Sequence, residues 1–368
     1  MKTIKIKWRN EKGVVAPLVA IMLSVLLGAV AMAIDVGYMM NTRTELQRIA
    51  DAAALAGART LGRLYECNAD LASCTQPMPY EDQLNYEPDS AVIKQASIEM
   101  GLQNRAGDKT GITISEADII IGNWDGAAHT LTANSISPDA VRVTARRDGS
   151  ANGPITLFFA RVLGIDTADV SATATAALTG ESTVGPGKVI PVGISYAWYL
   201  NKGANNFCDQ PIKFYPSNDP ESCAGWTTFF NKNAAESYLR KDILEEWLNN
   251  PSTPPTPEVK AGEEIAFTGG TLGNQTFTAF YNLWDYMRKN DGDGNDAVWT
   301  AMVPVYDSTS CENPNQNMKV IGFSTVEITN VVPPNVEITA TVKCDNVVSG
   351  RGGGAPTGTK GSIPGLVQ

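Results

Sequence analysis

The first hydrophobic pattern along the chain is an unbroken apolar run from Val14 to Ile34. These 21 residues include no charged side chain. At ~1.5 Å rise per residue, a helix of this length crosses the ~30 Å hydrocarbon core of a bilayer. Pro17 stands near the start of the run, where a helix tolerates a missing N–H. The pattern therefore predicts a transmembrane helix over residues 14–34.

The helical pattern continues beyond this run. Apolar or small side chains recur at spacings of three and four residues and define a stem face, which consists of Leu46, Ile49, Ala50, Ala53, Ala54 and Gly57. Asp51 lies off that face. We predict a helical stem over residues 35–64, ended by Gly62, so that span and stem form one rod of about 50 residues. The stem face either packs on the protein's own domain or contacts another subunit of an assembly.

Residues 65–181 combine helical and alternating patterns. The run 140–147 alternates cleanly, with Val141, Val143 and Ala145 on the inner side. The other predicted strands are 112–121, 130–133 and 169–178, and the predicted helices are 91–105 and 154–163. Helices and strands in this order predict an α+β domain in which helices cover one face of a sheet. The same order of elements occurs in pilin-like folds, and we note this as an analogy between folds.

A glycine- and proline-rich stretch at residues 182–188 predicts a boundary, after which residues 188–349 form a β-rich domain. Its predicted strands are 189–195, 298–306, 318–329 and 336–344, and its predicted helix is 234–248. The Gly- and Pro-rich end, residues 350–368, is predicted to be either an ordered edge or a loose tail.

Charge is distributed unevenly along the chain. Residues 1–13 carry five cationic side chains and Glu11, a net charge of +4, whereas the whole chain carries −10. Cationic segments stay on the cytoplasmic side of a membrane, so the acidic remainder is expected outside the cytoplasm. An acidic body without a basic stripe argues against binding to nucleic acid.

The cysteine count is even: Cys67, Cys74, Cys208, Cys223, Cys311 and Cys344. In an exported chain this indicates disulfides. We predict sequential pairing, 67 with 74, 208 with 223 and 311 with 344, although fifteen connectivities are formally open and free buried thiols are the alternative. Two processing alternatives compete with a retained anchor: signal-peptidase cleavage at Ala31-Met32-Ala33, and prepilin-like cleavage after Gly13.

The N-terminal residues carry a resemblance to a known family. Lys12-Gly13, the apolar run, Ile34-Asp35-Val36-Gly37 and the segment from Ala50-Asp51-Ala52 to Gly57-Ala58 resemble the signature of the TadE/TadG-like proteins of Flp (Tad) pilus assembly. The resemblance covers about the first 60 residues strongly and extends more weakly to about residue 180. It implies an inner-membrane protein of a pilus or secretion system with its bulk in the periplasm. Many longer members carry a metal-binding D-x-S-x-S motif; here Asp307 is followed by Thr309 and Cys311, so 307–313 is interpreted as a strand end and turn.

Catalytic motifs are poorly represented. The only histidine, His129, falls in a predicted hairpin turn with no nucleophile motif nearby, and Arg351-Gly352-Gly353-Gly354 opens no helix. We therefore expect no enzymatic activity. One segment has oxygen ligands at alternate positions, which suits calcium: Asp291, Asp293, Asn295 and Asp296. Residue 302, however, is Met where an EF-hand has its bidentate glutamate, and Asp-Gly turns form for backbone reasons alone. We predict no cofactor, and calcium is the one alternative that this segment leaves open.

The sequence thus predicts a membrane-anchored structural or assembly component of a Tad (Flp) pilus or related secretion system. Its partners are expected to be the membrane and other proteins of that system, with homo- or hetero-oligomer contacts through the N-terminal helix. The residues predicted for that helix are Ser24, Gly28, Asp35, Gly37, Leu46, Ala50, Asp51, Ala54 and Gly57. Ser24 and Gly28 form a small-xxx-small pair that either seats another membrane helix or simply faces lipid. The alternative function is a surface-displayed binding module or adhesin that uses residues 188–349.

Overall fold

The computed structural model describes the chain in two compact units. The described residues are 15–67, 78, 80–203, 206–215, 222–231, 235–269, 272–290, 295–332, 337–344 and 346–368. Unit 1 combines Met1–Ala53, Ser97–Ile119 and Val143–Ala174, and unit 2 combines Ala54–Ala96, Ile120–Arg142 and Thr175–Gln368. Each unit is therefore assembled from three separate stretches of sequence. The predicted α+β class is confirmed, because a long apolar helix precedes a β-rich region.

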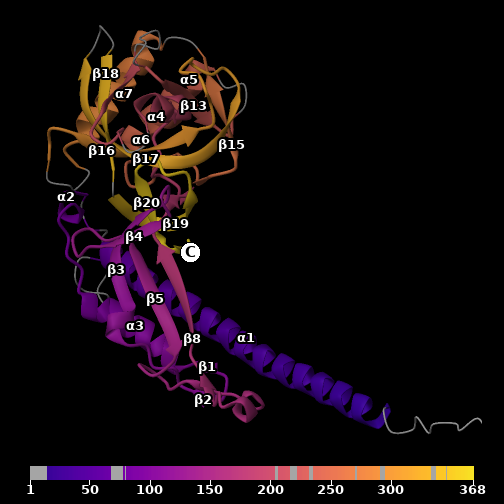
Figure 1. Ribbon diagram of the computed structural model, residues 1–368. Coiled ribbons are helices and arrows are strands. Elements are labelled where there is room, and N and C mark those ends of the chain that lie inside the picture. Colours follow the sequence, from indigo (N-terminus) through magenta and orange to yellow (C-terminus); the bar gives the residue numbers. More distant parts are fainter. Residues whose placement is uncertain are drawn as a thin grey trace, which may run out of the picture. The chain divides into compact units, whose positions relative to one another are not determined.

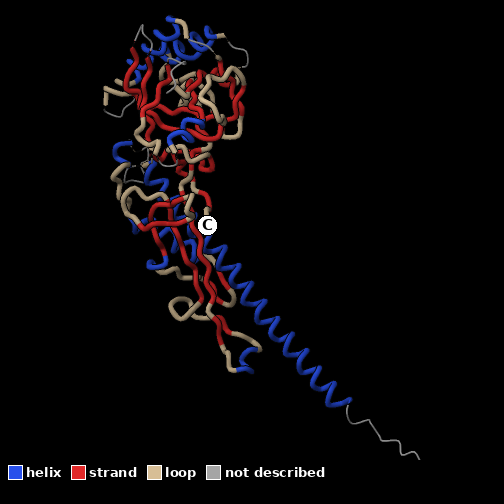
Figure 2. Tube along the Cα trace, turned by 45° about the horizontal axis from the view of Figure 1, so that its top comes forward, coloured by secondary structure: helices blue, strands red, loops and turns tan. Residues whose placement is uncertain are grey.

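The N-terminal helix, α1 (Val15–Glu66), is unbroken over 52 residues (Figures 1 and 2). Its length confirms the predicted continuous rod. The predicted end at Gly62 is wrong, since the helix continues for one more turn. Gly62 is needed there for a different reason: a Cβ at this position would overlap the backbone of Ser362. A close approach of two backbones, and not helix termination, explains this glycine.

Short elements and a five-stranded sheet follow the helix. They are α2 (Tyr80–Gln83), α3 (Ser90–Leu102), β1 (Arg105–Ala106), β2 (Lys109–Thr110), η2 (Glu116–Asp118), β3 (Ile119–Asp125), β4 (Thr130–Ala133), β5 (Ala140–Arg147), β6 (Ile155–Thr156), η3 (Ala160–Leu163), β7 (Thr167–Ala168) and β8 (Val170–Ala177). The sheet has the order β21-β8-β5-β3-β4, in which β21 (Gly365–Leu366) is an edge strand. The end of the chain is thus an ordered edge, one of the two predicted alternatives.

Alternation located the strands of this sheet well. In β5 the predicted inner residues Val141, Val143 and Ala145 are fully buried, which confirms the predicted face. Two neighbouring predictions fail. The predicted strand 112–121 contains the 3₁₀ turn η2, so that β3 begins only at Ile119. The predicted helix 154–163 is reduced to the single 3₁₀ turn η3 between two short strands. Gly164 nevertheless ends that turn in the left-handed conformation, as expected of a terminator.

Unit 2 contains a barrel-like sheet of seven strands (Figure 1). Its order is β12-β18-β17-β15-β13-β11-β16, and β16 also pairs with β17, which closes a ring. Most pairings are antiparallel, but β11 and β16 run parallel. The strands are β11 (Val192–Ser195), β12 (Pro211–Tyr215), β13 (Ala224–Phe229), β15 (Glu264–Thr268), β16 (Trp299–Tyr306), β17 (Asn317–Val332) and β18 (Glu337–Lys343).

Side chains from several helices pack into the core beside this sheet. The helices are α4 (Tyr196–Lys202), α5 (Glu236–Tyr238), the π-helix η4 (Leu239–Glu245), α6 (Glu246–Asn249) and α7 (Asn274–Met287). Phe280 of α7 lies 5.3 Å from the ring of Trp226 and 6.2 Å from that of Trp299. Trp284 donates from its indole nitrogen to the carbonyl of Ile328 on β17, at 3.0 Å. The sheet is therefore held by a packed aromatic layer as well as by its ladders.

A second, smaller closed barrel is formed by β9 (Gly180–Glu181), β19 (Asn346–Gly354) and β20 (Thr359–Ile363). Strands β19 and β20 are parallel, whereas β9 is antiparallel to both. A separate two-stranded pairing joins β10 (Thr183–Val184) to β14 (Val259–Lys260). Most of the described residues after residue 344 therefore belong to strands of unit 2.

The predicted sequential disulfides are wrong for four of the six cysteines. Cys208 pairs with Cys344, and Cys223 pairs with Cys311, with Cα–Cα distances of 5.3 and 4.3 Å. The reason for the first pair is strand register: Pro211 lies opposite Thr341, and continuing the antiparallel register by three residues brings Cys208 opposite Cys344. Cys67 is also disulfide-bonded. Cys74 lies outside the described residues, so the 67–74 pair stays a prediction.

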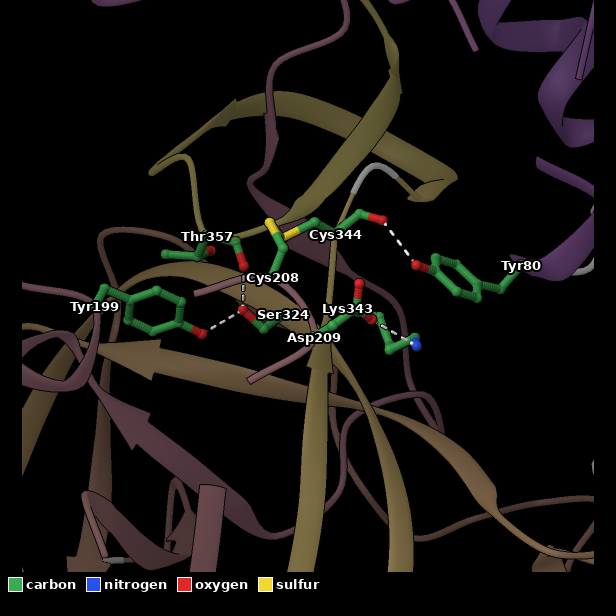
Figure 3. The surroundings of a disulfide bond; sticks show 8 residues. All are labelled: Tyr80, Tyr199, Cys208, Asp209, Ser324, Lys343, Cys344 and Thr357. Atoms are coloured by element: carbon green, nitrogen blue, oxygen red, sulfur yellow. Dashed lines mark hydrogen bonds and ion pairs between the residues drawn. A yellow bond between two sulfur atoms is a disulfide. The ribbon is translucent and has the colours of Figure 1, made fainter. Parts of the chain in front are cut away.

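Polar contacts surround the Cys208–Cys344 bond (Figure 3). The Tyr80 hydroxyl donates to the carbonyl of Cys344 at 3.1 Å, and the Lys343 ammonium contacts Asp209 at 2.8 Å. On the other side, Ser324 donates to the carbonyl of Thr357 and pairs with the Tyr199 hydroxyl. The disulfide therefore joins the start of the edge strand β12 to the end of its neighbour β18, and these hydrogen bonds lie around it.

Candidate functional site

The first part of the candidate site is the apolar span of α1. Among the described residues, α1 is the one helix long and apolar enough to cross a membrane, and its best window of 18 residues has a mean hydropathy of 2.5. None of that window is buried, and side chains such as Val25 are 67% exposed. A core helix of a water-soluble protein hides such a face. This span therefore has the length and exposure of a single-pass membrane anchor.

Asp35 marks the point at which the folded part begins on the helix. It is the first fully buried residue of α1, with 4% exposure. Its carboxylate accepts three backbone N–H groups, from Phe158 at 2.7 Å, Phe159 at 3.0 Å and Ala160 at 2.7 Å. Desolvation raises the pKa of Asp35, but the three donors together outweigh it and hold the pKa below its usual value. The ionised carboxylate thus joins the helix to a segment more than a hundred residues away.

Replacing Asp35 with alanine is expected to release that segment. The N–H groups of residues 158–160 would lose their acceptor, so their amide hydrogen exchange should accelerate several-fold. Exchange measured by mass spectrometry on the full chain in detergent provides the test. Asp51→Ala is the matched control, because Asp51 lies on the same helix and accepts only from Gln47 among the hydrogen bonds found for its carboxylate. Unchanged exchange at 158–160 in the Asp35 variant would show that these bonds do not hold the segment.

A second set of contacts lies just beyond Asp35, where the β1–β2 turn meets the helix. Gly107, at φ +61°, donates its N–H to Glu45 at 2.6 Å, and a Cβ there would come within 2.8 Å of the Tyr38 hydroxyl. Arg147, which is buried, donates to the carbonyl of Ala106 and to Asp108, both at 2.8 Å. The bond from Arg147 is the main reason that the pKa of Asp108 lies below its usual value. These bonds fix the turn against one side of the stem.

The stem face is buried within the protein itself. Leu46, Ala50, Ala53 and Ala54 have no exposed surface, and Gly57 is also buried. Ser97 of α3 donates to the carbonyl of Ala53 at 2.9 Å. Of the two predicted roles for this face, packing on the protein's own domain is the one that the structure shows. Small side chains are needed here because they let backbones approach closely.

Ser24, Gly28 and Gly37 contact no other element among the described residues. The Ser24 hydroxyl bonds only to the carbonyl of Ala20 in its own helix, at 2.8 Å, and no atom lies within 4 Å of a Cβ built at Gly28 or Gly37. Ser24 and Gly28 therefore lie on the part of the span that is open to lipid or to another helix, and Gly37 is exposed just beyond the span. A helix–helix contact through them stays a prediction.

The predicted calcium site is only partly described. Asp291 and Asp293 lie outside the described residues, whereas the Asn295 side chain accepts from the N–H of Ala297 at 3.3 Å and the Asp296 carbonyl accepts from Arg288. Calcium binding therefore stays a prediction.

If calcium binds, adding a chelator should lower the thermal unfolding midpoint, because a ligand at 100-fold excess over its Kd stabilises the folded state by ~2.7 kcal/mol. The variant Asp293→Asn, which lacks one predicted ligand, should respond less to the chelator. An unchanged midpoint in the wild type would rule out the calcium site.

The tested catalytic motifs form no active site in the described part of the chain. His129 is exposed, at φ 51°, in the turn between β3 and β4, as the hairpin prediction required. Asp307 follows the end of β16, which confirms the predicted strand end and turn. Across the described ranges, no three His, Cys, Asp or Glu side chains cluster as metal ligands. The expectation that the protein is not an enzyme stays a prediction.

Sequence reasoning missed three features of this site. It included Asp35 among the helix residues but gave no hint of its acceptor role, because the donors are 123 to 125 residues away. It placed a helix where the Asp35-bound segment is a loop. It also gave no sign that Glu181 or Arg147 would be buried. The consecutive apolar residues Phe158 and Phe159 were the only local signal.

The fold and the site together define a class of protein. It is an α+β protein that begins with a long helix, and the apolar first half of that helix is exposed. Comparison with protein families shows what two segments of the chain are similar to. Residues 13–60 match the family described as Flp pilus-assembly TadE/G-like, and residues 50–176 match that described as Tad-like Flp pilus-assembly. The predicted resemblance of the N-terminal region is thereby confirmed. Neither comparison with curated proteins nor comparison with solved structures yields a match.

Proposed function

We propose that this protein is a single-pass inner-membrane component that helps assemble a Tad (Flp) pilus or a related secretion system. The observation that carries the proposal is the coincidence of two features in one segment. The matched region begins at residue 13, and it contains both the free apolar span and the stem that the protein buries in its own fold. A role as an assembly component follows from the described function of the matched families.

Orientation follows from charge. The segment before the span has a net charge of +4, and the rest of the chain is acidic. By the positive-inside rule, the N-terminus would stay in the cytoplasm and residues after Asp35 would lie in the periplasm. The paired cysteines suit that oxidising compartment, where disulfides persist.

The anchoring step is tested by placing charge in the span. The double variant Leu23→Lys and Leu26→Lys changes side chains that are 55% and 63% exposed, so the fold itself should be unaffected. Each lysine at the centre of a span costs ~3 kcal/mol of insertion free energy. We expect the variant to leave the membrane fraction and to fail to restore piliation in a deletion strain. The control, Val36→Lys with Met40→Lys, places the same charge beyond the span and should behave as wild type.

The same deletion strain separates the proposal from the adhesin alternative. Loss of surface pili on deletion, restored by the wild-type chain, is the expected result. If the deleted strain keeps its pili but no longer attaches to surfaces, residues 188–349 act as a binding module and the assembly role is wrong. Full piliation by the double-lysine variant would show that anchoring is unnecessary.

A further inference from the structure

Unit 1 exposes an unusual group of apolar side chains far from the span in sequence. We define the apolar loop as residues 157–166, between β6 and β7. Its exposed side chains are Phe158 at 61%, Phe159 at 44%, Val162 at 89%, Leu163 at 73% and Ile165 at 54%. Outside α1, no other ten-residue stretch of the described chain carries more than two large exposed apolar side chains. Leaving such a group in water is costly, which indicates that something covers it.

The loop holds these side chains outward on a fixed backbone. At its base, Leu157 is buried and donates its N–H to the carbonyl of Asp166 at 3.0 Å. At its tip, Gly164 and Ile165 donate to the carbonyls of Arg161 and Ala160, at 3.0 and 3.1 Å. These hydrogen bonds give the loop a defined backbone conformation, so the exposed apolar side chains form a defined surface.

The position of the loop along α1 identifies what covers it. Asp35, which binds the N–H groups of residues 158–160, directly follows the last residue of the apolar span. The ring of Phe158 also lies 5.4 Å from that of Tyr38, just beyond Asp35. At ~1.5 Å rise per residue, Val30 is only about 7.5 Å from Asp35 along the helix axis. The loop thus lies at the level where the span leaves the hydrocarbon.

We infer that the apolar loop inserts into the outer interface of the bilayer that α1 crosses, as a second point of membrane contact. This inference rests on the proposed anchoring of α1. Aromatic and aliphatic side chains with one cation are typical of segments that lie at the headgroup and acyl boundary. Arg161 is exposed within the group, and its guanidinium can reach lipid phosphates while its stem lies on apolar surface. Two contacts fix the orientation of unit 1 about the membrane normal, whereas a single helix alone leaves it free to rotate.

The test uses a photoreactive benzophenone amino acid, placed singly at Val162, Leu26 or Leu200 of the full chain. The protein is reconstituted in phosphatidylethanolamine vesicles with phosphatidylglycerol as the minority lipid, illuminated and analysed for adducts by mass spectrometry. Leu26 lies in the span, and Leu200 is a control of similar exposure, at 55%, outside unit 1. We expect lipid adducts at 162 and 26, each several-fold above the yield at 200.

The outcomes separate the two proposals. If position 26 gives no lipid adduct, anchoring of α1 fails and the inference fails with it. If position 26 reacts with lipid but position 162 gives no adduct above the level at 200, the loop does not reach the bilayer. Protein–protein adducts at 162 without lipid adducts would assign the loop to a second copy or a partner and overturn the inference.

A charged variant gives an independent readout. Val162→Asp with Leu163→Asp changes the two most exposed side chains of the loop, so thermal unfolding in detergent should be unchanged. In vesicles, lipid adduct formation from a benzophenone at position 165 should fall several-fold, because carboxylates are disfavoured at the apolar boundary and are repelled by anionic headgroups. The control Leu200→Asp with Phe230→Asp should leave that yield unchanged. An equal yield from the loop variant and its control would overturn the inference.

Discussion

Replacing Gly62 with alanine is expected to destabilise the protein by roughly 2–4 kcal/mol, although the same change in an open helix stabilises by ~1 kcal/mol. Gly62 is buried in the penultimate turn of α1, where strand β20 passes. A methyl group there would overlap the carbonyl oxygen of Ser362 and lie 2.8 Å from its carbonyl carbon. Because both clashing atoms belong to the backbone, no side-chain rotation relieves the overlap. The strand must move away.

That movement would also break the bonds that surround the contact. Arg59 donates to the Ser362 carbonyl at 3.1 Å and forms an ion pair with Glu66 at 3.3 Å, and the Ser362 hydroxyl in turn donates to Glu66. Displacing β20 separates this group and leaves a partly buried charge less well paired. The loss is therefore expected to exceed the helix gain.

The measurement is denaturant unfolding of the full chain in detergent, followed by circular dichroism. Gly37→Ala is the matched control: it lies on the same helix, and no atom stands within 4 Å of its added Cβ. It should be neutral or slightly stabilising. If both variants have the same free energy of unfolding, β20 does not approach the helix as closely as the structure places it.

Patterns of period two and 3.6 predicted the elements that present one face to a core and one to solvent. Strands β5, β8 and β18 lie where alternation placed them, and α1 forms the predicted rod. The missed strand β13 is buried at all six positions, so it has no alternation to detect. The missed helix α7 begins with the polar residues Asn274 and Gln275 and is rich in aromatic side chains, which favour strands in isolation.

Patterns of this kind could not predict contacts between segments that are distant in the sequence. The disulfide between Cys208 and Cys344 spans 136 residues and depends on the register of β12 with β18. Local spacing contains no information on that register. The candidate site divides in the same way: the span and stem face could be predicted from local periodicity, whereas the Asp35 bonds needed the tertiary fold.

The second large effect is expected from Glu181, whose side chain is sealed inside the small barrel of β9, β19 and β20. It has no exposed surface, and Cβ atoms built at Gly350 and Gly361 would lie 2.5 and 2.9 Å from its carboxyl oxygens. One oxygen accepts the N–H of Thr183 at 2.8 Å, and the other has no hydrogen-bond partner in the described structure. Burial raises the pKa of Glu181 to about 7, against the opposing effect of nearby backbone N–H groups.

A raised carboxyl pKa makes the folded state the better proton acceptor. Between the ordinary value of 4.5 and about 7, the folded protein holds a proton that the unfolded chain has lost. Stability is therefore expected to fall as pH rises through this window, by ~3 kcal/mol in total, and then to level off for this group. The slope is opposite to that of a carboxylate in an ion pair.

Glu181→Gln isolates this contribution, because glutamine has nearly the same shape and no charge at any pH. The variant should resemble the wild type at pH 5 and be more stable by up to ~3 kcal/mol at pH 8, as measured by denaturant unfolding at a series of pH values. Glu87→Gln, at an exposed position of the same unit, is the control and should keep the wild-type pH dependence. If the free energy of unfolding of Glu181→Gln still falls as pH rises from 5 to 8, a group other than Glu181 takes up the proton in the folded state.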